Sequence, residues 1–351
     1  MFLRELEVDH LRCVERAEME LHPGVNLIQG PNGAGKTSLL EAIYLLGRGR
    51  SFRTRHAERL LRAGESSFRV LGRVGEAYVG VIGVGFDRET GLEVRIDRRT
   101  PRSLAELSLA FPVQVLDPGI HRLVEEGPSL RRRWLDWGVF HVEQGFVELW
   151  SDFSLALKQR NAALKLGEDP SPWDPEVARL GEALAAARRR TMDLLLPLWK
   201  DTVASLLDQE VALGYFQGWS QERSLADSLQ HHRQGDLDRG TTGQGPHRFD
   251  VVMTLGRTAA RDYLSRGQQK LLGCAMALSM AQLVGVVASR DTTLLLDDPA
   301  AELDEEKTAR LLSAVRRLKG QLVLTSLDWE GAPVLQPDRV FHVEQGRVQS
   351  A

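Results

Sequence analysis

A glycine-rich octapeptide, Gly30-Pro-Asn-Gly-Ala-Gly-Lys-Thr37, constrains this chain more than any other feature. The apolar segment 25–29 before it predicts a strand, and the apolar positions at helical spacing over 37–46 predict a helix. A turn of this pattern between a strand and a helix is typical of a phosphate-binding loop, where backbone N–H groups and a helix N-terminus surround phosphate oxygens. The alternative is a glycine-rich turn that binds nothing, and the adjacent lysine and threonine argue against it.

The residue types in this loop have separate expected roles in holding ATP with Mg²⁺. The Lys36 ammonium would contact the β- and γ-phosphates, and the Thr37 hydroxyl would ligate Mg²⁺. The residues expected to contact the nucleotide are Gly30, Asn32, Gly33, Gly35, Lys36, Thr37 and Ser38.

Two acids end the apolar segment Thr293-Leu-Leu-Leu-Asp-Asp298. Asp297 would hold the Mg²⁺ shell, and Asp298 would orient the attacking water or accept its proton. Paired carboxylates can also mark a simple strand end. Their place after a phosphate-binding loop, and before Pro299-Ala-Ala-Glu-Leu-Asp304, favours the catalytic interpretation.

The segment Leu264-Ser-Arg-Gly-Gln-Gln-Lys270 resembles the L-S-x-G-Q signature of the ATP-binding-cassette and SMC ATPases. The resemblance implies that Ser265 and Gly267, with Gln268 beside them, contact the γ-phosphate of ATP held by the opposite subunit of an ATP-dependent homodimer. A serine that caps an ordinary helix is the alternative. Gln114, at the expected strand 113–116, stands where the family's Q-loop glutamine would contact metal and water; a glutamine without that role is the alternative there.

Two departures from the family pattern predict slow hydrolysis. Asp298 stands where many of these ATPases have glutamate, and its shorter side chain should place the carboxylate less well. The histidine expected after the next strand is missing, because Leu322-Val-Leu-Thr-Ser326 carries Thr325 and Ser326 instead. A hydroxyl there could still bond the γ-phosphate. Both departures suit a weak, DNA-dependent ATPase that works as a switch.

The pattern along the chain predicts an α/β fold: an ATP-binding-cassette/SMC-type ATPase head, with a mixed β-sheet and helices, into which an α-helical lobe is inserted. We expect the head over 1–120 and 241–351, and the inserted lobe over 121–240. Long helical stretches cover 130–166 and 176–207, separated by a proline-rich connector at 167–175. The polar, glycine-rich stretch 235–245 predicts a mobile loop.

The resemblance narrows to the RecF family of DNA repair proteins. The insertion is far shorter than the coiled coils of SMC proteins, and several blocks look like RecF: residues 30–44, 47–53, 133–137, 158–164, 245–248 and 264–270. The resemblance implies a recombination mediator that binds duplex DNA and single-strand/duplex junctions. It also implies ATP-dependent dimerisation and work with RecR, RecO and a RecA-type recombinase.

Any nucleic-acid surface must be a local patch, because the net charge is −3. Arg48, Arg50, Arg53 and Arg55 begin a basic run that extends to Arg62, and clustered cations bind phosphate backbones. The arginine triplets at 131–133 and 188–190 are further candidates. A solvated, salt-bridged surface is the alternative for each of them, and it is favoured for the triplets.

Cysteine usage and hydropathy predict a cytoplasmic protein without a membrane span. Cys13 and Cys274 are the two cysteines, and they offer neither a metal pair nor a disulfide framework. The first residues predict a strand rather than a signal peptide. The apolar run 271–288 is interrupted by Ser279, Gln282 and glycine, which favours a buried helix behind a sheet.

Two other functions fit parts of the sequence. An ATPase subunit of a nuclease complex, or a nuclease of its own, would require an added cluster of carboxylates in a C-terminal nuclease domain, and the roughly 50 residues after Asp298 leave no room for one. A P-loop small-molecule kinase would need no signature segment. We therefore expect an ATP-controlled DNA-binding mediator.

Overall fold

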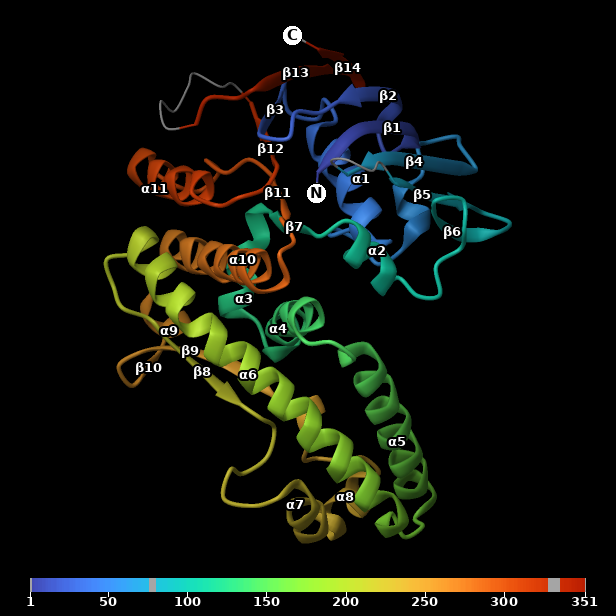
Figure 1. Cartoon of the computed structure of the whole chain (residues 1–351), viewed down its shortest axis with the longest axis vertical. Coiled ribbons are helices and arrows are strands. Elements are labelled where there is room, and N and C mark those ends of the chain that lie inside the picture. Colours follow the sequence, from blue (N-terminus) through green and yellow to red (C-terminus); the bar gives the residue numbers. More distant parts are fainter. Residues whose placement is uncertain (1, 76–79, 328–334, 351) are drawn as a thin grey trace. The chain divides into compact units, whose positions relative to one another are not determined.

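The computed structural model describes residues 2–75, 80–327 and 335–350. It divides into two compact units (Figure 1). The head unit contains Met1–His121 and Arg266–Ala351, and the inserted unit contains Arg122–Ser265. The inserted unit runs past residue 240, where we expected it to end, because strand β9 (Asp250–Leu255) pairs with β8 (Ala212–Phe216) inside it.

A six-stranded sheet forms the centre of the head unit, in the order β14-β13-β3-β12-β11-β7. Its strands are β3 (Val25–Gln29), β7 (Val113–Leu116), β11 (Thr293–Leu296), β12 (Leu322–Ser326), β13 (Arg339–Glu344) and β14 (Arg347–Ser350). All neighbouring pairs are parallel except β13 with β14. Parallel strands that are covered on both faces are apolar throughout, which explains the run of leucines in β11.

Helices cover both faces of this sheet. Figure 1 shows α1 (Lys36–Arg48) and α11 (Glu305–Arg316) on opposite sides of β3, β12 and β11. Side chains of α1 share one hydrophobic core with Ile28, Leu295 and Val323 from the sheet. Because the carboxyl ends of parallel strands lie at one edge, the loops after β3, β11 and β7 are brought together there.

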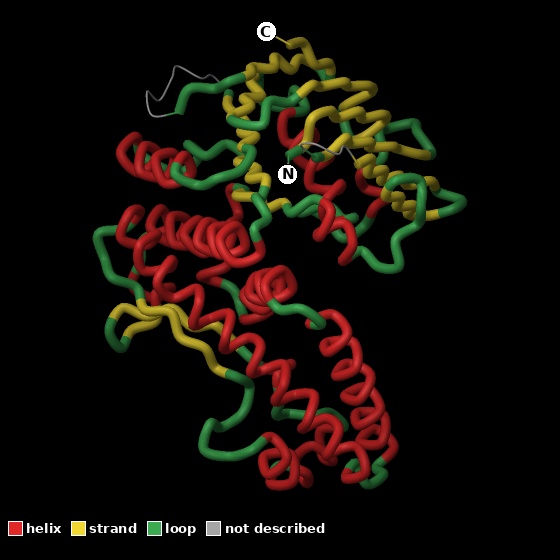
Figure 2. Tube along the Cα trace, in the orientation of Figure 1, coloured by secondary structure: helices red, strands yellow, loops and turns green. Residues whose placement is uncertain are grey.

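A five-stranded antiparallel sheet belongs to the same unit, in the order β2-β1-β4-β5-β6 (yellow in Figure 2). Its strands are β1 (Leu3–Leu11), β2 (Val14–Glu20), β4 (Ser67–Val74), β5 (Gly80–Asp87) and β6 (Gly91–Ile96). The register Asp87↔Gly91 shows that β5 and β6 form a hairpin. Alternate residues of these strands are buried against α1, and the short helix α2 (Ala105–Ala110) follows.

The inserted unit is mainly helical (Figure 2). Its elements are α3 (Arg122–Glu125), α4 (Pro128–Val142), α5 (Phe146–Leu166), α6 (Asp174–Leu206), α7 (Leu225–His231), α8 (Arg233–Arg239), α9 (Ala260–Tyr263), and the sheet of β8, β9 and β10 (Thr258–Ala259). The single helical stretch predicted over 130–166 was wrong, since the chain turns before α5 at Gly145, whose φ is 74°. The loop predicted over 235–245 begins inside α8 instead.

Helix α10 (Arg266–Ala288) contains the long apolar run. It is long and apolar enough to cross a membrane by composition alone, but 72% of its most apolar window is buried within the protein. The core helix of a soluble protein has the same character. The prediction of a buried helix behind the sheet is therefore confirmed.

Candidate nucleotide site

The loop between β3 and α1 has a backbone that only glycine adopts readily. Gly30 and Gly35 have φ values of 154° and 118°. A Cβ atom on Gly30 would lie 2.1 Å from the carbonyl oxygen of Val343 on β13, so a side chain there would displace backbone. Asn32 and Gly33 are exposed, and backbone N–H groups at the start of α1 are placed to bind phosphate.

The ammonium of Lys36 lies across this loop. Its Nζ donates to the carbonyl oxygens of Gly30, at 2.6 Å, and Pro31, at 3.1 Å. Burial lowers the pKa of Lys36, and the negative charges of Asp298 and Asp297 oppose that shift. A partly desolvated cation held only by carbonyl oxygens is suited to bind phosphate oxygens in their place.

Asp297 joins the phosphate-binding loop to the neighbouring strands. Its Oδ1 accepts from the hydroxyls of Thr37, at 2.9 Å, and Thr325, at 3.0 Å, and its N–H donates to Leu116 on β7, at 3.0 Å. Thr37 and Asp297, two of the three residues predicted to contact Mg²⁺, are therefore in direct contact. A hydroxyl and a carboxylate oxygen at one edge of a sheet are ligands of the hard type that Mg²⁺ prefers.

Burial raises the pKa of Asp297, which is only 8% exposed. Hydrogen bonds from Thr37 and Thr325, and the positive charge of Arg53, act in the opposite direction, and Asp298 adds a small further increase. A buried carboxylate without a full positive partner gains from a divalent cation. The residues present therefore fit Mg²⁺, although they hold no three-residue cluster of His, Cys, Asp or Glu within the described ranges.

Thr325 lies beside the acidic pair. It is fully buried, donates to Asp297 and accepts from the Asp298 N–H at 2.9 Å. Its hydroxyl therefore bonds both residues of the acidic pair. Asp298 itself has a φ of 47°, a conformation that non-glycine residues seldom adopt. Thr325 thus supports the backbone that presents Asp298.

Gln114 does not come together with the other site residues. Strand register pairs it with Leu294, three positions before Asp297 on β11, which is about 10 Å along the strand. The residue that follows β7 at the carboxyl edge is Asp117, beside Asp297. The prediction placed the glutamine by its proximity to a strand, and the parallel register shows that it lies within the strand.

The residues of the basic run after α1 differ in their surroundings. Some contact α1, one lies near the nucleotide site, and others are exposed at the surface. Ser51 donates to Glu41, a carboxylate that is fully buried and also held by Arg12. This contact ties the run to α1 and leaves Arg53 close enough for its charge to lower the pKa of Asp297. Arg53 was predicted as a DNA contact, and the structure places it near the nucleotide site.

The remaining members of that run differ in exposure. Arg48 stacks over the ring of Tyr44, with its guanidinium carbon 5.7 Å from the centroid. Arg50 and Arg55 are exposed, and within the described ranges neither forms an ion pair. The guanidinium groups of Arg50 and Arg55 therefore remain available to bind phosphate.

One arginine of each triplet, Arg131 and Arg188, lies in the interior of the inserted unit. Arg131 forms a two-bond pair with Asp250, and Arg188 forms one with Asp136. Their exposures are 7% and 2%, so neither guanidinium is available to DNA. Arg190 pairs with Glu143 at the surface. Arg190 therefore fits the solvated, salt-bridged surface that was the alternative, whereas the ion pairs of Arg131 and Arg188 are buried and fit neither interpretation.

The signature residues lie at the start of α10. Ser265 is exposed and directly precedes the helix, while Gly267 and Gln268 are in its first turn. Buried Lys270, one turn further, donates its ammonium to the carbonyl oxygen of Ala301, in the loop after Asp298. An exposed hydroxyl at a helix N-terminus suits an anion that comes from outside the protomer.

Two turns that were not predicted from the sequence border the phosphate-binding loop. Cys13, after β1, lies with its Sγ 3.7 Å from the Ser38 hydroxyl. In the turn after β13, the N–H of Gly346 donates to Ala34 at 2.8 Å. Ser38 itself is only 6% exposed. No sequence motif marks either turn.

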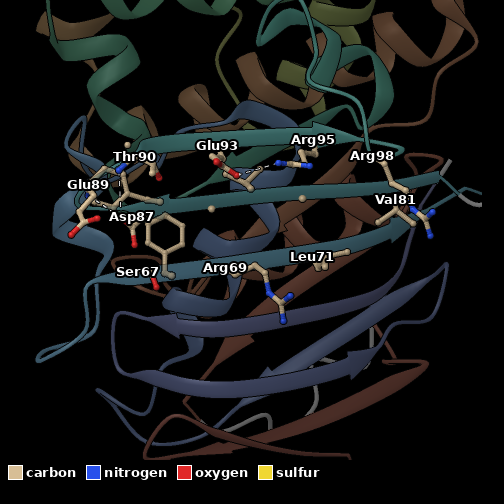
Figure 3. Close-up of a pocket in the computed structure, with 16 residues that line it drawn as sticks. Ser67, Arg69, Leu71, Val81, Asp87, Glu89, Thr90, Glu93, Arg95 and Arg98 are labelled. Carbon is tan, nitrogen blue, oxygen red and sulfur yellow. Dashed lines mark hydrogen bonds and ion pairs between the residues drawn. The ribbon is translucent and has the colours of Figure 1, made fainter.

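A separate hollow of about 730 Å³ lies on the outer face of β4, β5 and β6 (Figure 3). Gly83 and Gly85 leave its floor without side chains, and Arg69, Glu93 and Arg95 stand around it. The hollow contains none of the phosphate-binding, acidic or signature residues, so it is distinct from the nucleotide site.

Comparison with known proteins supports the family resemblance that the sequence motifs indicated. A family model described as the RecF/RecN/SMC N-terminal domain matches residues 2–348. The chain is 38% identical to the DNA replication and repair protein RecF of Azotobacter vinelandii, across 99% of this chain and 98% of that protein. It is 37% identical to the RecF of Pseudomonas fluorescens strain SBW25, over the same shares.

Solved structures are similar over the full chain. A structure of the recombination mediator protein RecF with ATP, in the RecFOR pathway, superposes with a TM-score of 0.87 at 25% identity, covering 100% of this chain and 97% of that one. An Smc head bound to a ScpA domain gives a TM-score of 0.64 at 14% identity, covering 100% and 97%. The fold is that of an SMC/RecF ATPase head, as the sequence predicted.

Proposed function

Because this chain belongs to the RecF family of DNA replication and repair proteins, we propose that it is a recombination mediator controlled by ATP. The observation that supports this most strongly is the joined pair of Thr37 and Asp297 beside Lys36, in a chain whose signature serine is exposed. Lys36, Thr37 and Asp297 complete one half of a composite ATPase site. The signature supplies the other half to a second copy of the chain.

ATP would bind with its phosphates in the loop 30–37, against Lys36 and the start of α1. Thr37 and Asp297 would hold Mg²⁺, which neutralises phosphate charge when it is bound. Ser265 and Gly267 of a second copy would then cover the exposed γ-phosphate. The closed dimer is stable only while that phosphate is present, so the bound nucleotide sets the assembly state.

Asp298 is proposed to orient the attacking water and accept its proton. Asp298→Asn should lower the hydrolysis rate by roughly 100-fold or more, because a general base contributes about that much. The variant should still bind ATP and form a dimer that persists for longer. Hydrolysis and dimer lifetime measured side by side test this. Rapid dissociation of the ATP-bound variant, at the rate of the parent, would show that hydrolysis does not control release.

Arg53 is proposed to add positive charge beside the phosphates. Arg53→Ala should weaken ATP binding by roughly five-fold, about the effect of one exposed charged contact. Arg88→Ala, which removes the same charge from the exposed β5–β6 turn, is the matched control. Equilibrium titration with a fluorescent ATP analogue measures both variants. If Arg53→Ala and Arg88→Ala bound the ATP analogue with equal affinity, Arg53 would again be a candidate DNA contact rather than a nucleotide contact.

DNA is the proposed macromolecular ligand, with duplex and single-strand/duplex junctions as the preferred forms. The exposed guanidinium groups of Arg50 and Arg55 supply charge for backbone contacts, which weaken as salt concentration rises. We further propose that the protein is cytoplasmic, works with RecR and RecO, and assists a RecA-type recombinase; in support, a similar solved structure is described as a mediator in the RecFOR pathway.

The test of this function is binding to a fluorescently labelled gapped duplex, followed by anisotropy with and without ATP and Mg²⁺. We expect binding that needs ATP and declines steeply between low and physiological salt. A chain that binds the duplex equally well without nucleotide would contradict ATP control. One that ignores DNA under all conditions would contradict the mediator function itself.

A further inference from the structure

His121 connects the strand beside the acidic pair to the signature helix. It is the last residue of the short 3₁₀ turn η2 (Pro118–His121), which follows β7, and it is only 7% exposed. Its Nδ1 lies 3.1 Å from the carbonyl oxygen of Pro118, and its Nε2 lies 3.1 Å from Nη2 of Arg266. Both ring nitrogens therefore have partners.

The chemistry of these partners assigns the tautomer. A carbonyl oxygen can only accept, so Nδ1 must carry the proton and donate to Pro118. A guanidinium can only donate, so the unprotonated Nε2 accepts from Arg266. His121 acts as a neutral acceptor, which is the role that its geometry requires.

The turn that carries His121 is packed closely on α10. A Cβ atom on Gly273 of α10 would lie 2.6 Å from the carbonyl oxygen of Ile120, so glycine is required for this approach. The same turn continues from Leu116, which accepts from the N–H of Asp297. One short segment thus connects the edge that holds the acidic pair to the helix that begins with the signature.

Arg266 is the residue between Ser265 and Gly267, the two that would contact a partner's nucleotide. Besides His121, it approaches Glu302 at 3.9 Å, in the loop after the acidic pair. Its side chain is otherwise mostly exposed, and nothing about the arginine itself fixes its direction. The contact with buried His121 therefore restricts the directions that the Arg266 side chain can take.

We propose that His121 is a positioning residue: through its Nε2 it holds Arg266, so that Ser265 and Gly267 are presented to ATP bound on a second copy of the chain. This inference rests on the proposed ATP-dependent dimer. The inference adds a physical connection, within one protomer, between the acidic pair of its nucleotide site and the signature that contacts its partner.

Two substitutions separate the acceptor from the bulk of the ring. His121→Leu fills the space without an acceptor, and His121→Gln keeps an oxygen near the position of Nε2. We expect His121→Leu to weaken ATP-dependent dimerisation roughly two- to ten-fold, the usual effect of one hydrogen bond, without changing ATP binding by the monomer. His121→Gln should restore dimerisation to within about two-fold of the parent.

Sedimentation velocity across a range of protein concentrations measures the dimers, and titration with a fluorescent ATP analogue measures nucleotide binding. In a third variant, Arg266→Ala, the additional change His121→Leu should have little further effect, because both remove one interaction. Fully additive losses of dimerisation in the double variant would overturn the proposal. A His121→Leu protein that dimerises like the parent would also overturn it. So would a His121→Gln protein whose dimerisation is as weak as that of His121→Leu. A parent protein that does not dimerise with ATP would instead overturn the proposed function, and this inference with it.

Discussion

Ser265→Arg is expected to abolish ATP-dependent dimerisation while the monomer still binds ATP. The serine is exposed at the start of α10, so the larger side chain has room in the monomer. In the dimer the longer side chain would occupy the space between the signature and the partner's γ-phosphate and hold the two surfaces apart. Overpacking of this kind costs about 1–3 kcal/mol or more, which weakens association by roughly 10- to 100-fold.

The matched control for this variant is Ser151→Arg, which adds the same side chain to an exposed position of α5. Self-association is measured with ATP and Mg²⁺, and nucleotide binding is measured at concentrations where the parent is monomeric. We expect Ser151→Arg to behave like the parent in both assays. Normal dimerisation of Ser265→Arg would show that the signature does not act across an interface.

Lys36→Met is expected to remove productive ATP binding. The ammonium lies on the carbonyl oxygens of Gly30 and Pro31, at the position that phosphate oxygens would share. Loss of one preorganised charge at a reacting phosphate reduces turnover by about 100-fold or more. Methionine keeps much of the side-chain volume, so the loop should still fold.

Lys200→Met, at an exposed position of α6, removes the same charge far along the chain and is the control. ATP hydrolysis and the rise in melting temperature caused by ATP are the measurements, because a ligand that binds only the folded state stabilises it. Lys200→Met should retain both. If Lys36→Met kept the full stabilisation by ATP, the nucleotide would bind elsewhere.

Local sequence was sufficient to predict the strands that surround the candidate site. The phosphate-binding loop, the acidic strand and the signature are each defined by a few contiguous residues, and the strands at 113–116, 293–296 and 322–326 lie where expected. The contact between Thr37 and Asp297 follows from parallel strands that end at one edge. Sequence order and strand direction were sufficient for this much.

The remainder depends on packing and register. Gln114 was placed wrongly because only the pairing with Leu294 shows how far it lies from the edge. Arg160 gives a second example: it is fully buried in the inserted unit, where it donates to Asp174 and Asp236. A polar stretch such as 235–245 resembles a loop until such buried partners are known, so it was predicted to be mobile.

The account depends most on assembly by ATP, and sedimentation velocity tests this directly. The parent chain and Ser265→Arg are compared with and without ATP and Mg²⁺, and again with a labelled gapped duplex. We predict a parent that sediments as a dimer only with ATP and then carries the DNA, and a variant that stays monomeric throughout. A parent that remains monomeric with ATP, or a variant that dimerises equally well, would contradict the account.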